Sequence, residues 1–502
     1  IQLLLLYLCS YMGIVQRQGI KYSLVSYFGV AIGMLSTFLV YPYDLEVYGL
    51  FRFLVDTANL LAPFVLLGMV AVSTKFFPIF SEGNKKNNGF LGFLTLGALL
   101  GCTLFLGLWW IIKTPIMTFF SHKSSPLYEL YVPYIVPLVF LTVFFMLYRG
   151  YASNFKRIAI PAVLEQLIKI TFPILLILYV AKWISLELLV WGILVNFIVV
   201  VLAAVYYIYH LGQLHLKPNF RFFNKALFKQ MAAFALFSVM TNTGSVLASR
   251  IDTLMVGSML DLKKTGIYGL AALIASIIGI PLLAVNGITA PIISKALKED
   301  NLQEINSLYR KSSINLLLIG LFLFLGLWCS IDELLLLISK DDDLATGKYV
   351  ILFLGIAKVF DLATGINDSI TGFSKYYRFN FYTLMVLAVL NIVGNIIFIP
   401  TMGILGAAFA PMLASLLFNI VKYFYIKYKF GMQPFTLQTA KLLMISVVVY
   451  TVVQFLPTLP SPFLSLLLKS TIITLLYLPA VLYFGISEEV NGVVKGILKN
   501  KK

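Results

Sequence analysis

The sequence predicts an all-α polytopic membrane protein with about fourteen transmembrane helices. Of its 502 residues, 60% are hydrophobic and 12% are charged, whereas a soluble domain averages about 45–50% apolar and about 25% charged residues. Apolar runs long enough to cross a hydrocarbon core recur along the chain, for example 94–112 and 188–208. These runs are continuous, whereas the strands of a transmembrane β-barrel alternate between apolar and polar residues.

Each predicted span is an apolar run that ends at charged, glycine or proline residues. The chain begins with Ile1, and Met12 followed by a basic stretch is the better start, so residues 1–11 are interpreted as a start-site artefact or, less favourably, a signal remnant. The predicted spans are 22–42, 47–73, 90–112, 128–148, 161–181, 188–208, 230–257, 266–290, 312–331, 350–371, 379–400, 403–421, 442–458 and 463–484.

The basic residues are distributed asymmetrically between the loops. With the N-terminus inside, 26 of the 38 Lys and Arg residues fall in cytoplasmic segments and seven in outer loops. The positive-inside rule therefore predicts an inner-membrane protein with both termini in the cytoplasm. Because the net charge of +17 is spread over many short loops, topology explains it better than a nucleic-acid partner.

The sequence lacks the motifs of an enzyme. Cys9, Cys102 and Cys329 lie in hydrophobic segments, without the number or spacing of a disulfide framework or zinc site. A nucleotide-binding Gly-x-x-x-x-Gly-Lys-Ser/Thr loop and a His-Glu-x-x-His motif are both missing. The acidic triplet 341–343 is interpreted as a solvated loop. We expect no catalytic residues, no metal site and no cofactor.

The chain contains an internal repeat with a spacing of about 220 residues. Tyr-Gly-Leu opens the second predicted helix at Tyr48 and the eighth at Tyr268, and a Pro-Ile motif follows each of these helices at Pro78 and Pro291. Six helices separate the equivalents, so the two halves would have the same orientation in the membrane. The predicted organisation is an N-lobe (12–215), a C-lobe (216–430) and two added helices with a cytoplasmic tail (431–502).

Several charged side chains fall inside predicted spans, where a charge at the bilayer centre costs roughly 2.5–3.5 kcal/mol. Most of them must therefore face protein, water or headgroups. They are Arg52, Asp56, Glu165, Lys169, Arg250, Asp252, Lys358, Asp361, Asp368 and Lys469.

Spacing sorts these charges into groups. Arg52 and Asp56 are four residues apart and Lys358 and Asp361 three apart, so each pair can meet on one helix face. Together with Arg250 and Asp252, they are predicted to line a polar cavity, where a guanidinium suits an anionic pyrophosphate. Structural salt bridges between helices are the alternative interpretation.

The other buried charges are assigned structural roles. Glu165 and Lys169 are predicted to form an ion pair near the cytoplasmic end of their helix. Lys469 is predicted to extend to the outer membrane surface. Asp368 lies near the inner surface, and its role is left open.

Three segments resemble the polysaccharide-transport branch of the multidrug/oligosaccharidyl-lipid/polysaccharide (MOP) exporter superfamily. They are Ser249–Gly257 (SRIDTLMVG), Thr265–Leu270 (TGIYGL) and Glu46–Arg52 (EVYGLFR). The resemblance covers residues 12–485. It implies a MATE-like, V-shaped bundle of two pseudo-symmetric six-helix lobes that works by alternating access.

The resemblance also implies a cargo and roles for the charged residues. The cargo would be an undecaprenyl-pyrophosphate-linked oligosaccharide, the unit of O-antigen, capsule or exopolysaccharide. The expected substrate-binding cations are Arg52, Arg250 and Lys358, and the expected coupling or cavity acids are Asp56, Asp252 and Asp361. Expected partners are this lipid-linked oligosaccharide, membrane lipids, H⁺ or Na⁺ as a coupling ion, and the glycan-polymerisation machinery, with no nucleic acid.

Three alternatives stay open. A drug antiporter of the same superfamily would have twelve helices and an acid-dominated cavity, whereas this chain has two more predicted helices and interleaved Arg and Lys. The branch that flips the peptidoglycan precursor lipid II also has fourteen helices. A scaffold for a glycan-synthesis complex would leave the buried charges unexplained.

Overall fold

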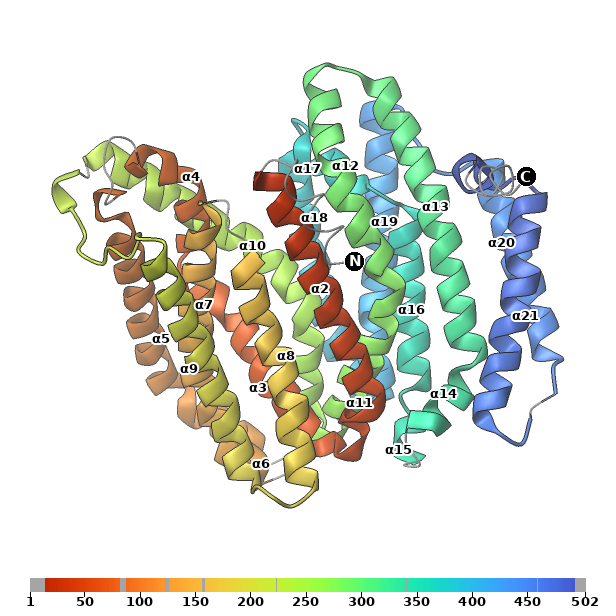
Figure 1. Ribbon diagram of the computed structural model, residues 1–502, viewed down its shortest axis with the longest axis horizontal. Coiled ribbons are helices and arrows are strands. Elements are labelled where there is room, and N and C mark those ends of the chain that lie inside the picture. Colours follow the sequence, from red (N-terminus) through yellow and green to blue (C-terminus); the bar gives the residue numbers. More distant parts are fainter. Residues whose placement is uncertain are drawn as a thin grey trace, which may run out of the picture. The chain divides into compact units, whose positions relative to one another are not determined.

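The predicted all-α fold class is confirmed. The computed structural model describes residues 14–81, 87–121, 126–155, 159–222, 224–338, 342–457 and 459–492, and these residues contain helices and no strand. The long helices of each half run side by side (Figure 1). The predicted start-site artefact, residues 1–11, lies outside the described residues.

The chain divides into two compact units, residues 1–266 and 267–502. The predicted N-lobe ended at residue 215. The first compact unit therefore includes the seventh predicted helix (230–257) as well as the preceding six. The organisation into two six-helix lobes stays a prediction. The helices of the first unit are α2 (Ile14–Leu39), α3 (Leu45–Val65), α4 (Met69–Ser81), α5 (Phe90–Ser121), α6 (Leu127–Tyr131), α7 (Ile135–Ser153), α8 (Ala159–Val180), α9 (Leu186–His210) and α10 (Lys225–Met259).

The second unit contains the remaining helices, and the first of them begins just before the boundary. They are α11 (Leu262–Ser276), α12 (Ile280–Lys298), α13 (Leu302–Cys329), α14 (Ile331–Ile338), α15 (Asp342–Ala345), α16 (Lys348–Ala363), α17 (Asn367–Phe373), α18 (Tyr377–Met402), α19 (Ile404–Phe430), α20 (Leu437–Gln454) and α21 (Pro462–Tyr483). Short 3₁₀ turns lie between some of these helices, including η3 (Val132–Tyr134) before α7 and η5 (Ile277–Gly279) before α12.

Most of the expected spans are present as long apolar helices. Within the described residues, ten helical segments are long and apolar enough to cross a membrane, and two bent pairs bring the number to twelve if each pair is one span. The other two predicted spans coincide with α2 and α10, which are helical but are not among the segments found within the described residues. The chain is a multi-pass membrane protein, and the total of fourteen stays a prediction.

The two bent pairs break at glycines with a left-handed backbone. The α3–α4 pair bends by 45° and the α16–α17 pair by 56°. Gly68, with φ of 72°, separates the first pair, and Gly365, with φ of 61°, separates the second. A Cβ on Gly68 would meet the backbone of Ala235 in α10. Glycine is therefore required there both by the backbone conformation and by the close approach of α10.

The N-termini of several helices are fixed by capping side chains. The Asp44 carboxylate accepts a hydrogen bond from the Val47 amide at 2.9 Å and begins α3. Asn224 caps α10 through the Leu227 amide at 2.6 Å. These side chains satisfy amide donors that have no partner within their own helix, so the sequence determines where the two helices that carry Asp56 and Arg250 begin.

Close helix contact in the first unit involves the Tyr-Gly-Leu segment. A Cβ on Gly49 would clash with the carbonyl oxygen of Leu262, and a Cβ on Gly266 would clash with that of Leu45. Tyr48 is buried and stacks on Tyr41 with ring centroids 4.3 Å apart. The motif that marked the repeat therefore marks a helix crossing where only glycine fits.

The two added C-terminal helices pack on α13. One hydrophobic cluster joins side chains of α13, α20 and α21, including Leu317, Leu321, Val449 and Tyr477. The Tyr477 hydroxyl donates a hydrogen bond to the Leu318 carbonyl at 2.8 Å. The hairpin of α20 and α21 is therefore an integral part of the second unit.

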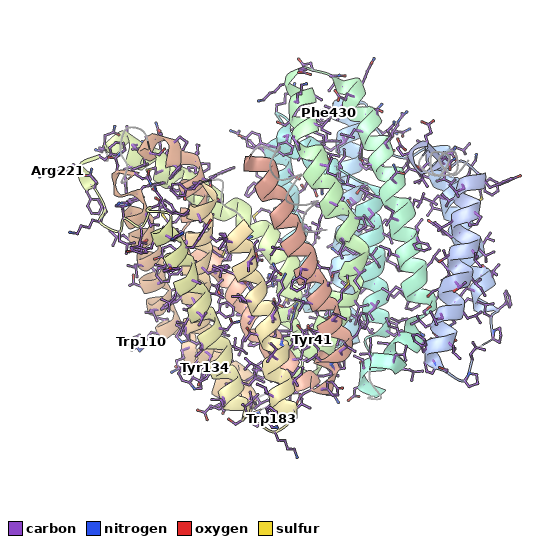
Figure 2. All side chains as sticks on the ribbon, viewed as in Figure 1. Tyr41, Trp110, Tyr134, Trp183, Arg221 and Phe430 are labelled. Carbon is purple, nitrogen blue, oxygen red and sulfur yellow. The ribbon has the colours of Figure 1, made fainter. Side chains whose placement is uncertain are left out.

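Aromatic and basic side chains mark the two ends of the first unit. In Figure 2, Tyr41, Trp110, Tyr134 and Trp183 lie toward one end of this unit and Arg221 lies at the other. Trp110 and Trp183 are 83% and 79% exposed. Exposed tryptophans are typical of the membrane interface, and basic loops of the cytoplasmic side.

Candidate functional site

A cluster of three charged side chains joins α3 to α10 in the first unit. Arg52 Nη2 lies 2.7 Å from Asp56 Oδ2, one turn away on α3. The other oxygen of the same carboxylate, Oδ1, pairs with the Arg250 guanidinium. The sequence predicted Arg52 with Asp56 and separately placed Arg250 beside Asp252, whereas the structure brings Arg52, Asp56 and Arg250 together.

The three side chains of the cluster carry two positive charges and one negative charge. The Asp56 side chain is 4% exposed, while those of Arg52 and Arg250 are 21% and 39% exposed. One carboxylate therefore holds two guanidiniums, and the Arg250 head keeps exposed donors. A guanidinium at the edge of a low-dielectric region is suited to binding a carboxylate or phosphate through two parallel hydrogen bonds.

Asp252 lies away from the exposed guanidinium of Arg250. Its residue is 7% exposed, and it lies two positions after Arg250, which puts it on the opposite side of α10. Burial of an acid within a predicted span is consistent with a role in ion coupling, and this role stays a prediction.

The second predicted pair is present in the second unit. Lys358 Nζ lies 3.6 Å from Asp361 Oδ2, with side chains 43% and 28% exposed. The other Asp361 oxygen accepts hydrogen bonds from Ser415 Oγ and Asn419 Nδ2, both at 2.8 Å. Asp361 is thus held between α16 and α19, while its lysine partner keeps access to the surroundings.

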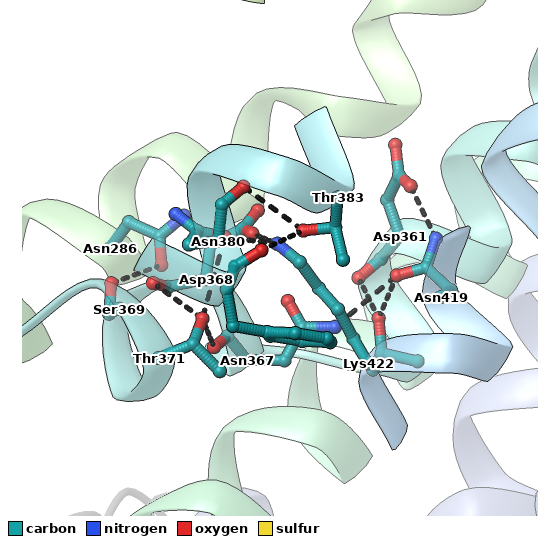
Figure 3. A network of polar contacts seen from close by, with 12 residues as sticks. Asn286, Asp361, Asn367, Asp368, Ser369, Thr371, Asn380, Thr383, Asn419 and Lys422 are labelled. Atoms are coloured by element: carbon teal, nitrogen blue, oxygen red, sulfur yellow. Dashed lines mark hydrogen bonds and ion pairs between the residues drawn. The ribbon is translucent and has the colours of Figure 1, made fainter. Parts of the chain in front are cut away.

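A polar network extends from Asp361 into the unit (Figure 3). The Asn419 side-chain oxygen accepts hydrogen bonds from Thr364 Oγ1 at 2.7 Å and from Asn367 Nδ2 at 3.3 Å. Asn367 begins α17, which also carries Asp368. The bend between α16 and α17 therefore places two carboxylates, one on each helix, in contact with residues of α19.

Lys422 is a member of this network that the sequence analysis missed. Its side chain is fully buried, pairs with Asp368, and donates to the Asn380 side-chain oxygen at 2.6 Å. Its Nζ also lies 4.0 Å from the centre of the Phe418 ring. The predicted span ended at residue 421, whereas α19 continues to Phe430, so the predicted end of this helix was wrong.

A signal for Lys422 exists in the sequence. On a continuous helix, Lys422 lies three residues after Asn419 and four after Phe418, so all three share one face. The polar residues on that face indicate that it points to protein rather than to lipid.

Two predicted structural roles were wrong. Glu165 pairs with Arg149 of α7 at 2.6 Å, not with Lys169, because a guanidinium from another helix lies within reach of the carboxylate. Lys469 does not extend to the membrane surface: its Nζ lies 2.5 Å from Glu333 Oε1 and 3.0 Å from the Cys329 carbonyl oxygen. Both side chains of this Lys469–Glu333 pair are buried, at 13% and 8% exposure.

The described residues contain no group of three or more His, Cys, Asp or Glu side chains that could hold a metal ion. The charged groups at the two predicted clusters are instead arginine, lysine and single carboxylates. This donor set suits an anion or a proton better than a transition metal.

Comparisons with known proteins agree with this architecture. The family model described as "Polysaccharide biosynthesis protein" matches residues 22–297, more than half of the chain, and the MatE model matches residues 238–397. No curated protein matches the sequence.

Several solved structures share the fold. The lipid II flippase MurJ in an inward closed conformation is 17% identical, with a TM-score of 0.75 over 93% of this chain and 98% of its own. An inward-facing multidrug resistance MATE family transporter of the MOP superfamily is 13% identical, with a TM-score of 0.61 over 81% of this chain and 94% of its own. A MOP superfamily transporter from Pyrococcus furiosus is 13% identical, with a TM-score of 0.52 over 84% and 96%. With the family model covering more than half of its length, this chain belongs to the polysaccharide biosynthesis protein family.

Proposed function

We propose that this protein is a flippase that moves an undecaprenyl-pyrophosphate-linked oligosaccharide across the cytoplasmic membrane by alternating access. The observation that carries the proposal is the Arg52–Asp56–Arg250 cluster, in which one buried carboxylate holds two guanidiniums. Membership of the polysaccharide biosynthesis family supports an oligosaccharide cargo. The protein would lie in the inner membrane with both termini in the cytoplasm.

The cluster is suited to an anionic headgroup. Asp56 neutralises one of two positive charges and orients both guanidiniums, so the unit remains cationic without leaving a bare charge in the membrane. A pyrophosphate would take the exposed donors of Arg250, which is 39% exposed. Most of the lipid chain would stay in the bilayer while the sugar moves with the headgroup.

The second unit is proposed to couple transport to the binding of a proton or a Na⁺ ion. Asp361 accepts two hydrogen bonds and faces Lys358 at 3.6 Å, so gain of a proton or a Na⁺ ion would change the charge balance at this pair. Asp252 is the second candidate for the coupling acid. Lys358 is proposed as an additional cation for the pyrophosphate. Moving an intact substrate across the membrane requires no nucleophile and no base, and we propose transport rather than catalysis.

Deletion of the gene tests the proposed cargo. The lipid-linked oligosaccharide of a surface polysaccharide should accumulate on the cytoplasmic leaflet, and the wild-type gene should reverse this. Accumulation of lipid II instead would favour a lipid II flippase, the activity of MurJ, whose structure shares this fold. Increased drug susceptibility without any glycan-lipid accumulation would contradict the proposal and favour an antiporter.

Substitution of Arg250 tests the proposed site. Arg250→Gln should lower transport about tenfold or more, since one charged contact to the cargo is worth at least about 1.4 kcal/mol. Arg250→Lys should recover only part of the activity because an ammonium lacks the two-pronged donor geometry.

Arg149→Gln is the matched control. Arg149 has nearly the same exposure, 37%, and also forms an ion pair in the first unit, but it lies outside the cluster. Equal transport by Arg250→Gln and Arg149→Gln at equal expression would show that the cluster does not bind cargo.

A further inference from the structure

The first unit contains an apolar pocket beside the charged cluster. The pocket has a volume of about 610 Å³ and is lined by side chains of α3, α5, α10 and the start of α7. Its lining includes Phe53 and Thr57 from α3, Leu104 and Leu108 from α5, and Leu254 from α10. No residue of the pocket carries a formal charge.

The chemistry of the pocket favours a hydrocarbon occupant. Apolar cavities of this kind stay dry because water needs polar partners. The pocket is lined in part by α5 and α7, which belong to segments long and apolar enough to cross the membrane, and its lining residues Leu104 and Leu108 are 60% and 53% exposed. It therefore opens toward the hydrocarbon region of the bilayer, and its volume is within the range of ligand sites, about 300–1,000 Å³.

The pocket and the charged cluster are neighbours along the same two helices. Asp56 of the cluster is followed directly by Thr57 of the pocket on α3. Arg250 lies one helical turn before Leu254 on α10, on the same face. A lipid whose phosphate binds Arg250 would consequently have the first part of its chain within reach of the pocket.

We propose that this pocket holds the first isoprene units of the polyprenyl chain of the cargo, next to its phosphate. The proposal rests on the proposed function and adds a site for the lipid part of the substrate. A phospholipid brings two chains for each phosphate, whereas this pocket is proposed to hold the single chain of a polyprenyl lipid. The pocket and the cluster would together recognise a phosphate attached to one apolar chain.

Photo-crosslinking tests the site directly. The full-length protein is placed in nanodiscs of phosphatidylcholine with a polyprenyl phosphate that carries a diazirine on the isoprene units nearest the phosphate. Cross-links should map to residues 53–67 and 101–112, and unlabelled polyprenyl phosphate should compete. Equal competition by phosphatidylglycerol would identify the pocket as a general lipid contact and overturn the proposal, as would cross-links confined to other helices.

Filling the pocket provides a second measurement. The double variant Leu104→Trp/Leu108→Trp should lower cross-linking about tenfold, the loss expected when the chain can no longer bury about two methylene groups. Leu106→Trp is the matched control, because Leu106 lies on the same helix and is 43% exposed but does not line the pocket. Labelling that is unchanged in the double variant would contradict the proposal; if the double variant fails to fold, the cross-link map of the wild-type protein decides.

The experiments distinguish failure of the proposed lipid-chain site from failure of the proposed transport function. If the wild-type gene complements the deletion but the pocket is not labelled, only the lipid-chain site is wrong. If the pocket is labelled but no glycan-lipid accumulates in the deletion strain, the transport proposal is wrong and the site binds a polyprenyl lipid for another purpose.

Discussion

Asp56 and Lys422 show two ways in which this protein holds a charge inside its helices. Asp56 is shared by two arginines, so the group keeps a positive charge and exposed donors. Lys422 is fully buried, and its ion-pair partner Asp368 is 53% exposed. The first arrangement presents a charge to a ligand, whereas the second ties the end of α19 to α17.

Loss of the Lys422 ammonium should therefore destabilise the second unit. Lys422→Met removes an ion pair and the hydrogen bond to Asn380, and a hydrogen bond to a charged group contributes about 1.5–3 kcal/mol. We expect the free energy of unfolding in detergent to fall by that amount. Lys427→Met, on the exposed side of the same helix, should change it by less than about 0.5 kcal/mol, and equal effects of the two variants would refute the assignment.

At the scale of helices, the buried Glu333–Lys469 pair links α14 to α21. Glu333→Gln should lower the free energy of unfolding by about 3 kcal/mol because it leaves a buried ammonium without its counter-charge. Asp332→Asn is an adjacent control: Asp332 also pairs with a lysine, Lys348, but is 65% exposed, and exposed pairs contribute at most about 1 kcal/mol. Hydrogen exchange in residues 462–483 should rise in Glu333→Gln alone; a similar rise in both variants would contradict this role.

The break between α3 and α4 makes a second prediction at this scale. Gly68→Ala should destabilise the protein by about 1–2 kcal/mol from the left-handed backbone alone, and more from its contact with the backbone of Ala235. Gly107→Ala, within α5 where a Cβ would meet no atom within 4 Å, should be neutral or stabilising by up to about 1 kcal/mol. Thermal unfolding of both variants measures the difference, and a stable Gly68→Ala protein would show that the bend does not need glycine.

The membrane-spanning helices could be predicted from the sequence, but their side-chain partners could not. Hydropathy is a property of consecutive residues, so α9 and α18 lie close to their predicted ranges. Spacing along one helix likewise predicted the Arg52–Asp56 and Lys358–Asp361 pairs. The partners of Glu165, Lys469 and Lys422 come from other helices, and which helix faces which is determined by packing that a single sequence does not display.

At the scale of the whole molecule, the distribution of charge predicts the orientation of the chain. In a variant without its native cysteines, Lys182→Cys should react with a membrane-impermeant maleimide in spheroplasts, since residue 182 lies in a predicted outer loop. Asp300→Cys, in the turn between α12 and α13, should react only after the membrane is permeabilised. The reverse pattern would place both termini outside and contradict the positive-inside prediction.

The pairing of Asp56 has a consequence for how the protein is made. The Arg250 partner lies 194 residues later in the chain, so several helices are synthesised after α3 before that partner exists. Arg52, one turn away, is already present when α3 leaves the ribosome, and the carboxylate can enter the bilayer with a local counter-ion. The two arginines therefore pair with Asp56 at different stages. Arg52 neutralises the carboxylate during membrane insertion, and Arg250 pairs with it when the helix bundle assembles.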